Sequence, residues 1–375
     1  MLEQIKKSPV KIGIILALLI IVNIVGWYIY LKWDAPLDEP LNLPTLTIEP
    51  SPESTSTATQ EIVETAESTL TATPEIINTP TYTPSPTIEP VCGNNTSVTI
   101  MLIGIDTEDY LYGLADSISL VRLDFQTKKV VMVSFPRDLW VDIPGATHYK
   151  VTLGKLNQAY FFGSEGMDLY DGSGYGAGLL AHTLLSNFGI SVDHYITVNK
   201  YAFRNIVDAL GGISVFLPED VYHKHNYMPV PRLFLPAGLH HLNGAQAEEV
   251  VRSRESADGD FGRIRNQTQV IKGLANQMLT PAGISQIPAL ANQLRGYVLT
   301  DLSPADITQM ACLATHIDPA QDIIFEHIIP SDERDGIQRF VWDTWREEQT
   351  LALVYDKEII TERLAEFEAG VWPPQ

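Results

Sequence analysis

Twenty consecutive residues, Ile12–Leu31, form an apolar run in which Asn23 is the single strongly polar side chain. An α-helix rises about 1.5 Å per residue, so this run would span the roughly 30 Å hydrocarbon core of a bilayer. Three lysines precede the run, whereas ten acids and no basic residue lie between Asp34 and Val91. This asymmetry predicts a single-pass protein of a bacterial cytoplasmic membrane, with its N-terminus inside and the rest of the chain outside.

A cleaved signal peptide is the competing interpretation of this run. Signal peptidase needs small side chains just after the apolar segment, but here the bulky sequence WYIYLKW occupies residues 27–33. The aromatic rings at this end also suit the headgroup region of a membrane. We therefore expect a cytoplasmic tail at residues 1–11 and an uncleaved transmembrane helix at residues 12–33.

The next segment, residues 34–91, has a different composition. It contains ten prolines and eighteen serines or threonines among its ten acids. Such a segment cannot bury enough apolar surface to offset the entropy lost on ordering, and repeated proline and like charge extend it. We expect a disordered linker that holds a folded domain away from the membrane or within a wall layer.

Residues 92–375 have the composition of a folded domain, with 21 basic and 35 acidic residues and a net charge of −14. An acidic domain argues against a nucleic-acid partner. Its two cysteines, Cys92 and Cys312, exclude a disulfide-dense scaffold. The sequence leaves open whether these two thiols form one extracytoplasmic disulfide or stay free.

Secondary-structure patterns in this domain alternate. Strand-like runs at 98–105, 117–124 and 129–135 should be neighbours in one sheet. Helical patterns follow at 176–188, 200–210 and 261–279, and the last 95 residues continue without an evident linker. Interleaved strands and helices predict a layered α/β domain. The turn-like segment GLHHLNG, with His240 and His241, is expected at the surface.

Two aspartates follow or begin apolar strands of this predicted sheet. Asp106 comes directly after MLIGI, and Asp116 begins ADSISL. Carboxylates at adjacent strand ends can share one hard cation, whose remaining ligands would be water and phosphate oxygens. An aspartate in such a position also commonly caps a turn, so Asp106 alone is equally consistent with a structural role.

Basic residues gather in two places. Arg137 lies just beyond a strand in SFPRDLWV, and Lys155 follows in GKLNQAY. A denser group occupies VVRSRESADGDFGRIRNQTQVI, which holds Arg252, Arg254, Arg263 and Arg265, and Asp260 is placed to cap the helix after it. A guanidinium cluster beside a helix N-terminus favours a phosphate-containing ligand over a merely solvated charged face. Pyrophosphate with a divalent cation fits best.

Seven segments, in order, resemble the LytR–CpsA–Psr family of cell-envelope transferases. They are LIGID, ADSISLVRLD, VSFPRDLWV, KLNQAY, VDALGGISV, LPAGLHHLNGAQAEEVVRSRE and DFGRIRNQTQVI, which together run from about Ser97 to Leu279. The resemblance implies a single three-layer α/β/α domain with a mixed central sheet after one N-terminal transmembrane helix. It also implies a Mg²⁺-dependent phosphotransferase that moves a glycopolymer from a polyprenyl-pyrophosphate carrier to peptidoglycan.

The resemblance assigns roles by position. Asp106 and Asp116 match magnesium-binding aspartates, and Asp260 matches an acid that could orient an arginine or accept a proton. Arg137 and Arg263 join Asp260 as the expected catalytic residues. The residues expected at the pyrophosphate are Arg137, Lys155, Arg252, Arg254, Arg263, Arg265 and Gln267.

Two departures from the family pattern separate the functional alternatives. Leu114 stands where the family usually has an arginine, and Asn266 replaces the second arginine of the last motif, a charge that Arg265 would supply from a shifted position. These departures leave open a non-catalytic polyprenyl-phosphate-binding protein. A lipid-linked pyrophosphatase, in which water replaces the sugar acceptor, is the second alternative to the transferase.

Overall fold

The computed structural model describes residues 32–44, 89–223, 230–256, 259–328 and 336–371. They belong to a compact unit made of Met1–Leu43 and Pro90–Gln375, and a second unit, Pro44–Glu89, is almost wholly outside the described residues. The expected transmembrane helix, apart from its last residues, is outside them as well. Within the described residues, no helix has the length and apolar character required to cross a bilayer.

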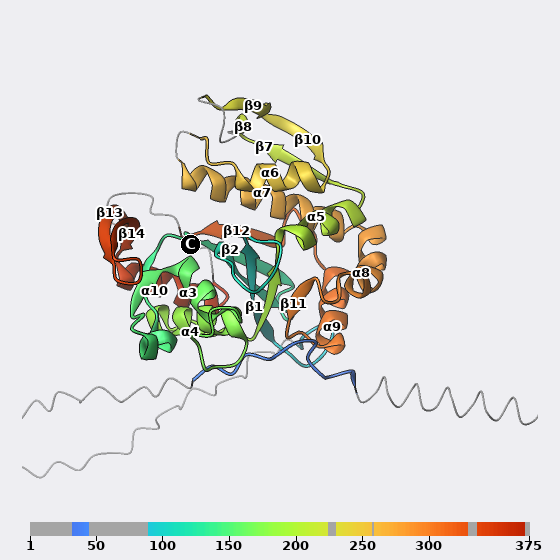
Figure 1. Cartoon of the computed structure of the whole chain (residues 1–375). Helices are drawn as coiled ribbons and strands as arrows, with labels where there is room; N and C mark the ends of the chain where they lie inside the picture. The colour runs from blue at the N-terminus through green and yellow to red at the C-terminus, as the bar shows by residue number, and fades with distance from the viewer. Residues whose placement is uncertain (1–31, 45–88, 224–229, 257–258, 329–335, 372–375) are drawn as a thin grey trace, which may run out of the picture. The chain divides into compact units, whose positions relative to one another are not determined.

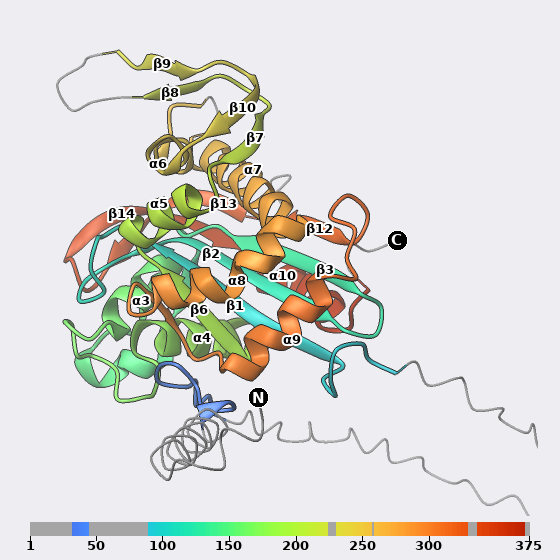
Figure 2. The same ribbon diagram turned by 90° about the vertical axis from the view of Figure 1, so that its right-hand side faces the viewer.

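A six-stranded mixed sheet forms the centre of the compact unit, in the order β11-β6-β1-β2-β3-β12 (Figures 1 and 2). β1 is antiparallel to β2, β2 to β3 and β6 to β11, whereas β6 is parallel to β1 and β12 to β3. The strands are β1 (Ser97–Ile105), β2 (Ala115–Asp124), β3 (Lys129–Phe135), β6 (His194–Val198), β11 (Val298–Thr300) and β12 (Ile323–His327). The expected mixed sheet and its three neighbouring strands are confirmed.

Helices and small two-stranded sheets surround this sheet. The helices are η1 (Pro144–Tyr149), α3 (Leu156–Gly163), α4 (Tyr175–Phe188), α5 (Lys200–Ala209), α6 (Gly244–Arg252), α7 (Asp260–Met278), α8 (Pro281–Leu294), α9 (Pro304–Ala314) and α10 (Lys357–Glu368). The paired strands are β4 (Trp140–Asp142) with β5 (Leu153–Lys155), β7 (Ile213–Leu217) with β10 (Gly238–Leu242), β8 (Val221–His223) with β9 (Arg232–Leu235), and β13 (Gly336–Asp343) with β14 (Glu348–Tyr355). The three predicted helices are confirmed, with ends that differ by one residue.

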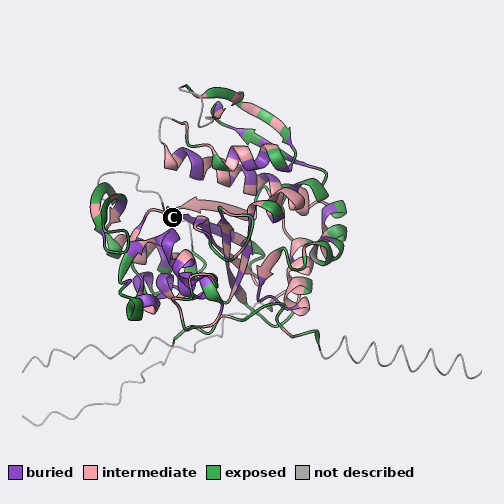
Figure 3. Ribbon diagram, in the orientation of Figure 1, coloured by how far each residue is buried: buried purple, intermediate pink, exposed green. Residues whose placement is uncertain are grey.

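One face of the central sheet packs against α3, α4 and α10. Alternate residues of β1, β2 and β3, among them Met101, Ile118 and Val133, join Leu179 and Phe367 in the main hydrophobic core. Side chains alternate between the faces of a strand, so this face receives every second, large apolar residue. Figure 3 shows the buried residues concentrated between these helices and the sheet.

The opposite face is covered by α5, α6 and α7, and by α9 farther along the strands (Figures 1 and 2). The sheet β7–β10 then packs on the outer side of α6 and α7 around Val215, Leu242 and Val270. The backbone of α7 can approach β7 closely because Gly273 faces Ser214 there. Helices therefore lie on both faces of the central sheet, and this additional small sheet covers one helical layer.

The turn after α5 requires glycine. Gly211 and Gly212 have φ of 78° and 91°, a region that side chains disfavour. A Cβ on Gly212 would also lie 2.6 Å from Nε2 of His241. His241 itself lies in the edge strand β10 rather than in a turn, and its ring contacts the Gly211 carbonyl oxygen at 3.0 Å.

Two features of the chain differ from expectation or settle an open alternative. Cys92 and Cys312 form a disulfide bond that joins the start of the domain to α9. Residues 34–43, expected to belong to the disordered linker, lie in the compact unit and are hydrogen-bonded to it. Their composition resembles that of the linker, but tertiary hydrogen bonds to the edge of the sheet determine their structure.

Candidate active site

A cavity of about 940 Å³ lies between the central sheet and α5, α6 and α7. Small side chains on this face of the sheet leave the space open, because Gly104, Ser117 and Ser119 stand where the other face has large residues. Both polar and apolar residues line it. Asp106, Asp116, Arg252, Arg254, Arg263 and Gln267 provide charged and polar groups, and Phe203, Ile206, Leu274, Ala275 and Met278 provide apolar ones.

The two predicted metal-binding aspartates both line this cavity. Asp106 follows β1, and its carboxylate accepts a hydrogen bond of 2.9 Å from the backbone N–H of Leu114. Asp116 belongs to β2, directly alongside, because Ile105 pairs with Ala115 in the register of the two strands. Leu114, where the family usually has an arginine, thus uses its backbone to position Asp106.

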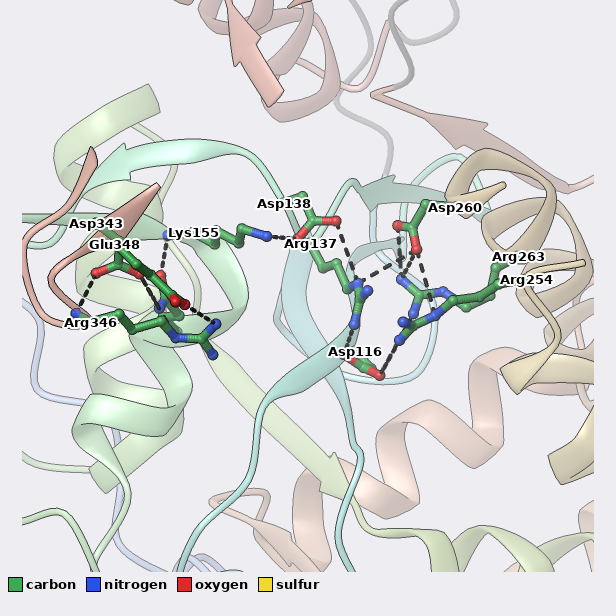
Figure 4. Close-up of polar contacts among 11 residues, drawn as sticks. Asp116, Arg137, Asp138, Lys155, Arg254, Asp260, Arg263, Asp343, Arg346 and Glu348 are labelled. Atoms are coloured by element: carbon green, nitrogen blue, oxygen red, sulfur yellow. Dashed lines mark hydrogen bonds and ion pairs between the residues drawn. The ribbon is translucent and has the colours of Figure 1, made fainter. Parts of the chain in front are cut away.

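Three guanidinium groups share the carboxylates of Asp116 and Asp260 (Figure 4). Arg137 is hydrogen-bonded to Asp116 and lies 3.5 Å from Asp260. Arg263 is 2.8 Å from Asp260 and 3.6 Å from Asp116, and Arg254 is 3.4 Å from Asp116. The cluster therefore joins four parts of the fold, which are β2, the turn after β3, the connection between α6 and α7, and the first turn of α7.

Arg263 is the most unusual member of this cluster, because its side chain is only 2% exposed. Burial and, to a smaller extent, nearby Arg137 together lower the pKa of its guanidinium to about 10, although Asp260 and Asp116 act in the opposite direction. Burial also opposes the charge of Arg137, but Asp116, Asp138 and Asp260 outweigh it and raise the pKa of Arg137 above its ordinary value. Both groups are therefore cationic at neutral pH.

Several donors in the cluster lack hydrogen-bond acceptors among the described residues. Nε and Nη1 of Arg263 and Nε of Arg137 are buried without such a partner. A buried donor without an acceptor costs roughly 1–3 kcal/mol, so native proteins rarely retain it without a purpose. The carboxylates of Asp260 and Asp116 partly offset this cost, at 3.5 Å from Nε of Arg137 and 3.6 Å from Nη1 of Arg263.

The sequence predicts that Asp260 caps α7, and this prediction is wrong. Gly259 is the N-cap of the helix, and among the described residues no side chain caps this end. Asp260 is instead the first helical residue, three positions before Arg263, and the two side chains meet on one face of the helix. It holds the buried guanidinium in place.

The other expected pyrophosphate residues occupy varied positions. Gln267, one turn after Arg263, donates to the backbone carbonyl of Asp116 at 3.3 Å. Arg252 lines the cavity and pairs with Glu248 at 3.2 Å. Lys155 contacts Asp138 at 3.0 Å, and Asp138 in turn lies 3.7 Å from Arg137, so Lys155 is connected to the cluster through one carboxylate.

Arg137, Lys155 and Asp260 belong to the ionic cluster although they do not line the cavity, whereas Arg265 belongs to neither. It is absent from the cavity lining, and its guanidinium lies 3.4 Å from Glu219. Two positions along an α-helix correspond to a rotation of about 200°, so Arg263 and Arg265 point to opposite sides of α7. Arg265 therefore does not supply the charge that Asn266 lacks.

The polar lining residues that sequence reasoning missed include Lys200, Tyr222, His223 and Glu248. Glu248 is 93% buried and joins Arg252 to Arg204 of α5, which it contacts at 2.9 Å. A glutamate four residues before an arginine on a helix was the available signal. Nothing local marks the other three, because the tertiary fold brings β8 and α5 to the cavity.

Comparison with known proteins places the chain in a family. Residues 54–352 match the LytR_cpsA_psr family. The chain belongs to this family. The resemblance expected from the seven segments is confirmed, and Asp106, Asp116, Arg137 and Arg263 lie within the matched region.

Curated relatives in the family are similar over part of their length. The chain is 32% identical over 218 residues to the regulatory protein MsrR of Staphylococcus aureus, covering 58% of this chain and 60% of MsrR. It is 32% identical over 229 residues to TagU of Oceanobacillus iheyensis, described as a polyisoprenyl-teichoic acid–peptidoglycan teichoic acid transferase. That match covers 61% of this chain and 65% of TagU. The match thus spans less than two thirds of either relative.

Solved structures share the fold. Bacillus subtilis TagV superposes with a TM-score of 0.56 at 25% identity, covering 72% of this chain and 96% of TagV. TagT bound to LIIa-WTA superposes with a TM-score of 0.53 at 20% identity, covering 76% and 96% of the two chains. The mixed α/β architecture with its central mixed sheet is therefore that of known LytR_cpsA_psr proteins.

Proposed function

We propose that this protein is a membrane-anchored phosphotransferase that moves a glycopolymer from a polyprenyl-pyrophosphate carrier to peptidoglycan through a phosphodiester bond. The observation that carries the proposal is one cavity with a buried arginine cluster and an apolar lining. Such a cavity suits a ligand with a pyrophosphate group and a hydrocarbon chain. The curated description of TagU, a transferase of polyisoprenyl-linked teichoic acid, supports the same substrate class.

The proposed reaction is a displacement at phosphorus. A sugar hydroxyl of the acceptor attacks the phosphate that carries the glycopolymer, its proton passes to a base, and the bond to the bridging oxygen breaks. The products are a phosphodiester and polyprenyl phosphate. Arg137 and Arg263 would stabilise the charge on the phosphate groups, and Asp260 would keep both guanidinium groups in position.

The site also suits Mg²⁺. Asp106 and Asp116 supply carboxylate oxygens from adjacent strand ends of one cavity, and Mg²⁺ prefers such oxygen ligands together with phosphate and water. When bound, the ion would offset charge on the pyrophosphate. Asp116 would then hold both the ion and Arg137, which would keep cation and guanidinium beside the same phosphate.

The test uses the full chain in detergent with a short polyprenyl-pyrophosphate oligosaccharide, Mg²⁺ and a peptidoglycan fragment. Mass spectrometry should detect a phosphodiester-linked conjugate that disappears in Arg263→Ala and Asp116→Ala and on removal of the metal ion. Arg346→Ala, which changes an exposed arginine of the β13–β14 turn, is the matched control and should leave the yield unchanged. Figure 4 shows Arg346 in a separate ionic group.

The other outcomes separate the alternative functions. Release of polyprenyl phosphate without a conjugate, with several acceptors tried, would identify a lipid-linked pyrophosphatase. Tight donor binding without any product would identify a non-catalytic binding protein. Either result would overturn the transferase.

A further inference from the structure

The segment that follows the predicted transmembrane helix is attached to the sheet. We call residues 33–43 the strap. Its backbone donates from Asp38 to the Thr300 carbonyl oxygen at 3.0 Å, and the Thr300 N–H donates to the Asp38 carboxylate at 2.8 Å. The Leu37 N–H donates to the Leu302 carbonyl oxygen at 3.3 Å. The strap is thus hydrogen-bonded to Thr300, the last residue of the edge strand β11, and to Leu302 just beyond it.

The strap is fixed on both sides of this edge. At its start, the Trp33 carbonyl oxygen accepts from the N–H of Ala305 in the first turn of α9, at 3.1 Å. Farther along, Leu41 and Leu43 pack against the main hydrophobic core, and the Tyr195 hydroxyl donates to the Glu39 carbonyl oxygen at 3.0 Å. Trp33, at the end of the predicted transmembrane helix, is therefore held beside α9.

The surface beside this attachment has almost no charge. From Gly273 to Leu294 the chain has 22 residues without Asp, Glu, Lys or Arg, although 19% of the whole chain is charged. This stretch includes all of α8, whose exposed residues include Ser285, Gln286, Ala289 and Gln293. A protein with a net charge of −21 is repelled by an anionic bilayer, and a neutral face is the one that can approach it.

Exposed aromatic residues border the same side. Trp33 and Tyr201 are each 42% exposed and Tyr297 is 47% exposed. The rings of Tyr201 and Tyr297 lie 5.3 Å apart, next to the start of β11. Trp and Tyr are enriched at membrane–water interfaces because their rings are amphipathic. Two exposed basic residues, Lys32 and Arg295, partly offset three exposed acids of the strap, Asp34, Asp38 and Glu39.

The apolar part of the cavity lies toward this side. Its lining includes Ala275 and Met278 at the C-terminal end of α7, which α8 follows directly, and Phe203 and Ile206 of α5. α8 packs against α5, α7 and α9. Figures 1 and 2 both show α8, α9 and the N-terminal end of the strap on one side of the sheet. The arginine cluster lies at the other end of the cavity, at the first turn of α7.

We propose that α8, together with Trp33, Tyr201 and Tyr297, is the face that contacts the lipid bilayer, and that the strap sets this orientation. The inference rests on the proposed membrane anchor and lipid-linked donor. It gives the hydrocarbon chain of the donor a short path from the bilayer to the apolar end of the cavity. It also replaces the expected spacer role of residues 34–91, because the strap keeps the domain close to the membrane.

The test places the full chain in lipid nanodiscs and measures depth. A fluorophore is attached at Gln286→Cys or Gln293→Cys on α8, and at Glu362→Cys on α10 as the control, since the native cysteines are joined in a disulfide. Lipids with a nitroxide near the headgroup should quench both α8 labels and leave the α10 label bright. Equal quenching of α8 and α10 would overturn the proposed face.

Strap variants test the second half of the proposal. Replacing residues 34–43 by glycine and serine at equal length should abolish the difference between the labels, whereas the same replacement of residues 50–84 should preserve it. Asp38→Pro, which removes one strap N–H, should reduce the difference, and Asp38→Asn is its control. A difference that survives both strap variants would overturn the role of the strap.

Transfer assays keep this inference separate from the proposed function. With a short-chain donor in detergent, strap variants should conjugate as well as the native chain. With a full-length lipid donor in nanodiscs, their yield should fall. If no variant and no native chain transfers anything, the proposed function fails, yet the quenching pattern still decides the orientation.

Discussion

The two faces of the central sheet use the same strands for opposite purposes. On one face, Ile118 and Leu120 of β2 are buried against α3 and α4 in the main core. On the other face, Ser117 and Ser119 of the same strand line the cavity. The strand alternates large and small residues rather than only apolar and polar ones. The cavity thus results from small side chains at alternate positions of the strand. The large side chains on the opposite face pack into the core and hold the strand in place.

The largest effect is expected when the side chain of Arg263 is removed from the cavity side of the sheet. In Arg263→Ala, kcat/KM for transfer should fall about 10³-fold, or roughly 4 kcal/mol, because a preorganised buried cation is lost and its two carboxylates are left unbalanced. Steady-state kinetics with mass-spectrometric detection measures the loss, and thermal unfolding verifies the fold. A fall of less than tenfold would contradict the proposed charge stabilisation.

A pair of neighbours on β2 compares the faces directly. Leu120→Ala on the filled face should lower the free energy of unfolding by about 3 kcal/mol, because the core around it cannot collapse fully. Ser119→Ala on the hollow face should lower it by about 1 kcal/mol, the value of its 2.9 Å hydrogen bond with Ser134. Urea denaturation of both variants gives the two numbers. Equal losses would show that the faces do not differ in packing.

A partly buried histidine, His327 of β12, predicts how stability changes with pH. Burial, with smaller contributions from Lys272 and Arg265, lowers the pKa of His327 to about 4. The unfolded chain binds the proton below about pH 6.5 and the folded chain only near pH 4. This contribution to stability is complete above pH 6.5 and is lost as the pH falls toward 4, by at most about 3 kcal/mol.

His327→Leu isolates this effect. The variant keeps the hydrogen bond of Thr268 to the Ile264 carbonyl oxygen and has no titratable group at this position. The difference in unfolding free energy between the native chain and the variant should change between pH 6.5 and 4 and stay constant above that range. A difference that does not change with pH would contradict the assigned pKa.

Filling the hollow should affect binding more than stability. Ala275→Trp places a large ring in the apolar part of the cavity, so donor affinity should fall about tenfold or more, at least about 1.4 kcal/mol. Ala365→Trp on the exposed side of α10 is the matched control. Calorimetric titration with a lipid pyrophosphate measures both. If the affinity of Ala275→Trp for the donor were unchanged, the hydrocarbon chain would not bind in this part of the cavity.

The smallest effect is expected for Arg265. Because its side chain points away from the cavity toward Glu219, Arg265→Ala should change the rate of transfer less than threefold, within about 0.6 kcal/mol. The same kinetic assay compares it with Arg263→Ala. A large loss would restore the pyrophosphate role that the sequence pattern indicated.

These contrasts show what sequence could and could not supply. The strands β1, β2 and β3 could be predicted from the sequence, because residues buried on one face of a strand recur at every second position. The segments around Asp106, Asp116 and Arg263 could be predicted as parts of a site, because each places a charged residue directly at the end of an apolar element. The structure brings all three to one cluster or cavity, as expected.

Other features depend on tertiary structure. The direction of Arg265 requires the rotation of α7 relative to the sheet, and Lys200 and His223 reach the cavity only through the fold. The strap was missed because its prolines and acids match those of the segment after it. Its order comes from hydrogen bonds to Thr300 and Leu302, some 260 residues away. A local pattern contains no trace of such partners.

The disulfide has a mechanical consequence. Tension applied to residues 45–88 enters the folded unit at Leu43 on one side and at Cys92 on the other. On the second side the covalent bond to Cys312 diverts the load into α9 before it reaches Ser97, where β1 begins. The segment between Cys92 and β1 therefore does not have to carry the whole force, because α9 shares it through the disulfide.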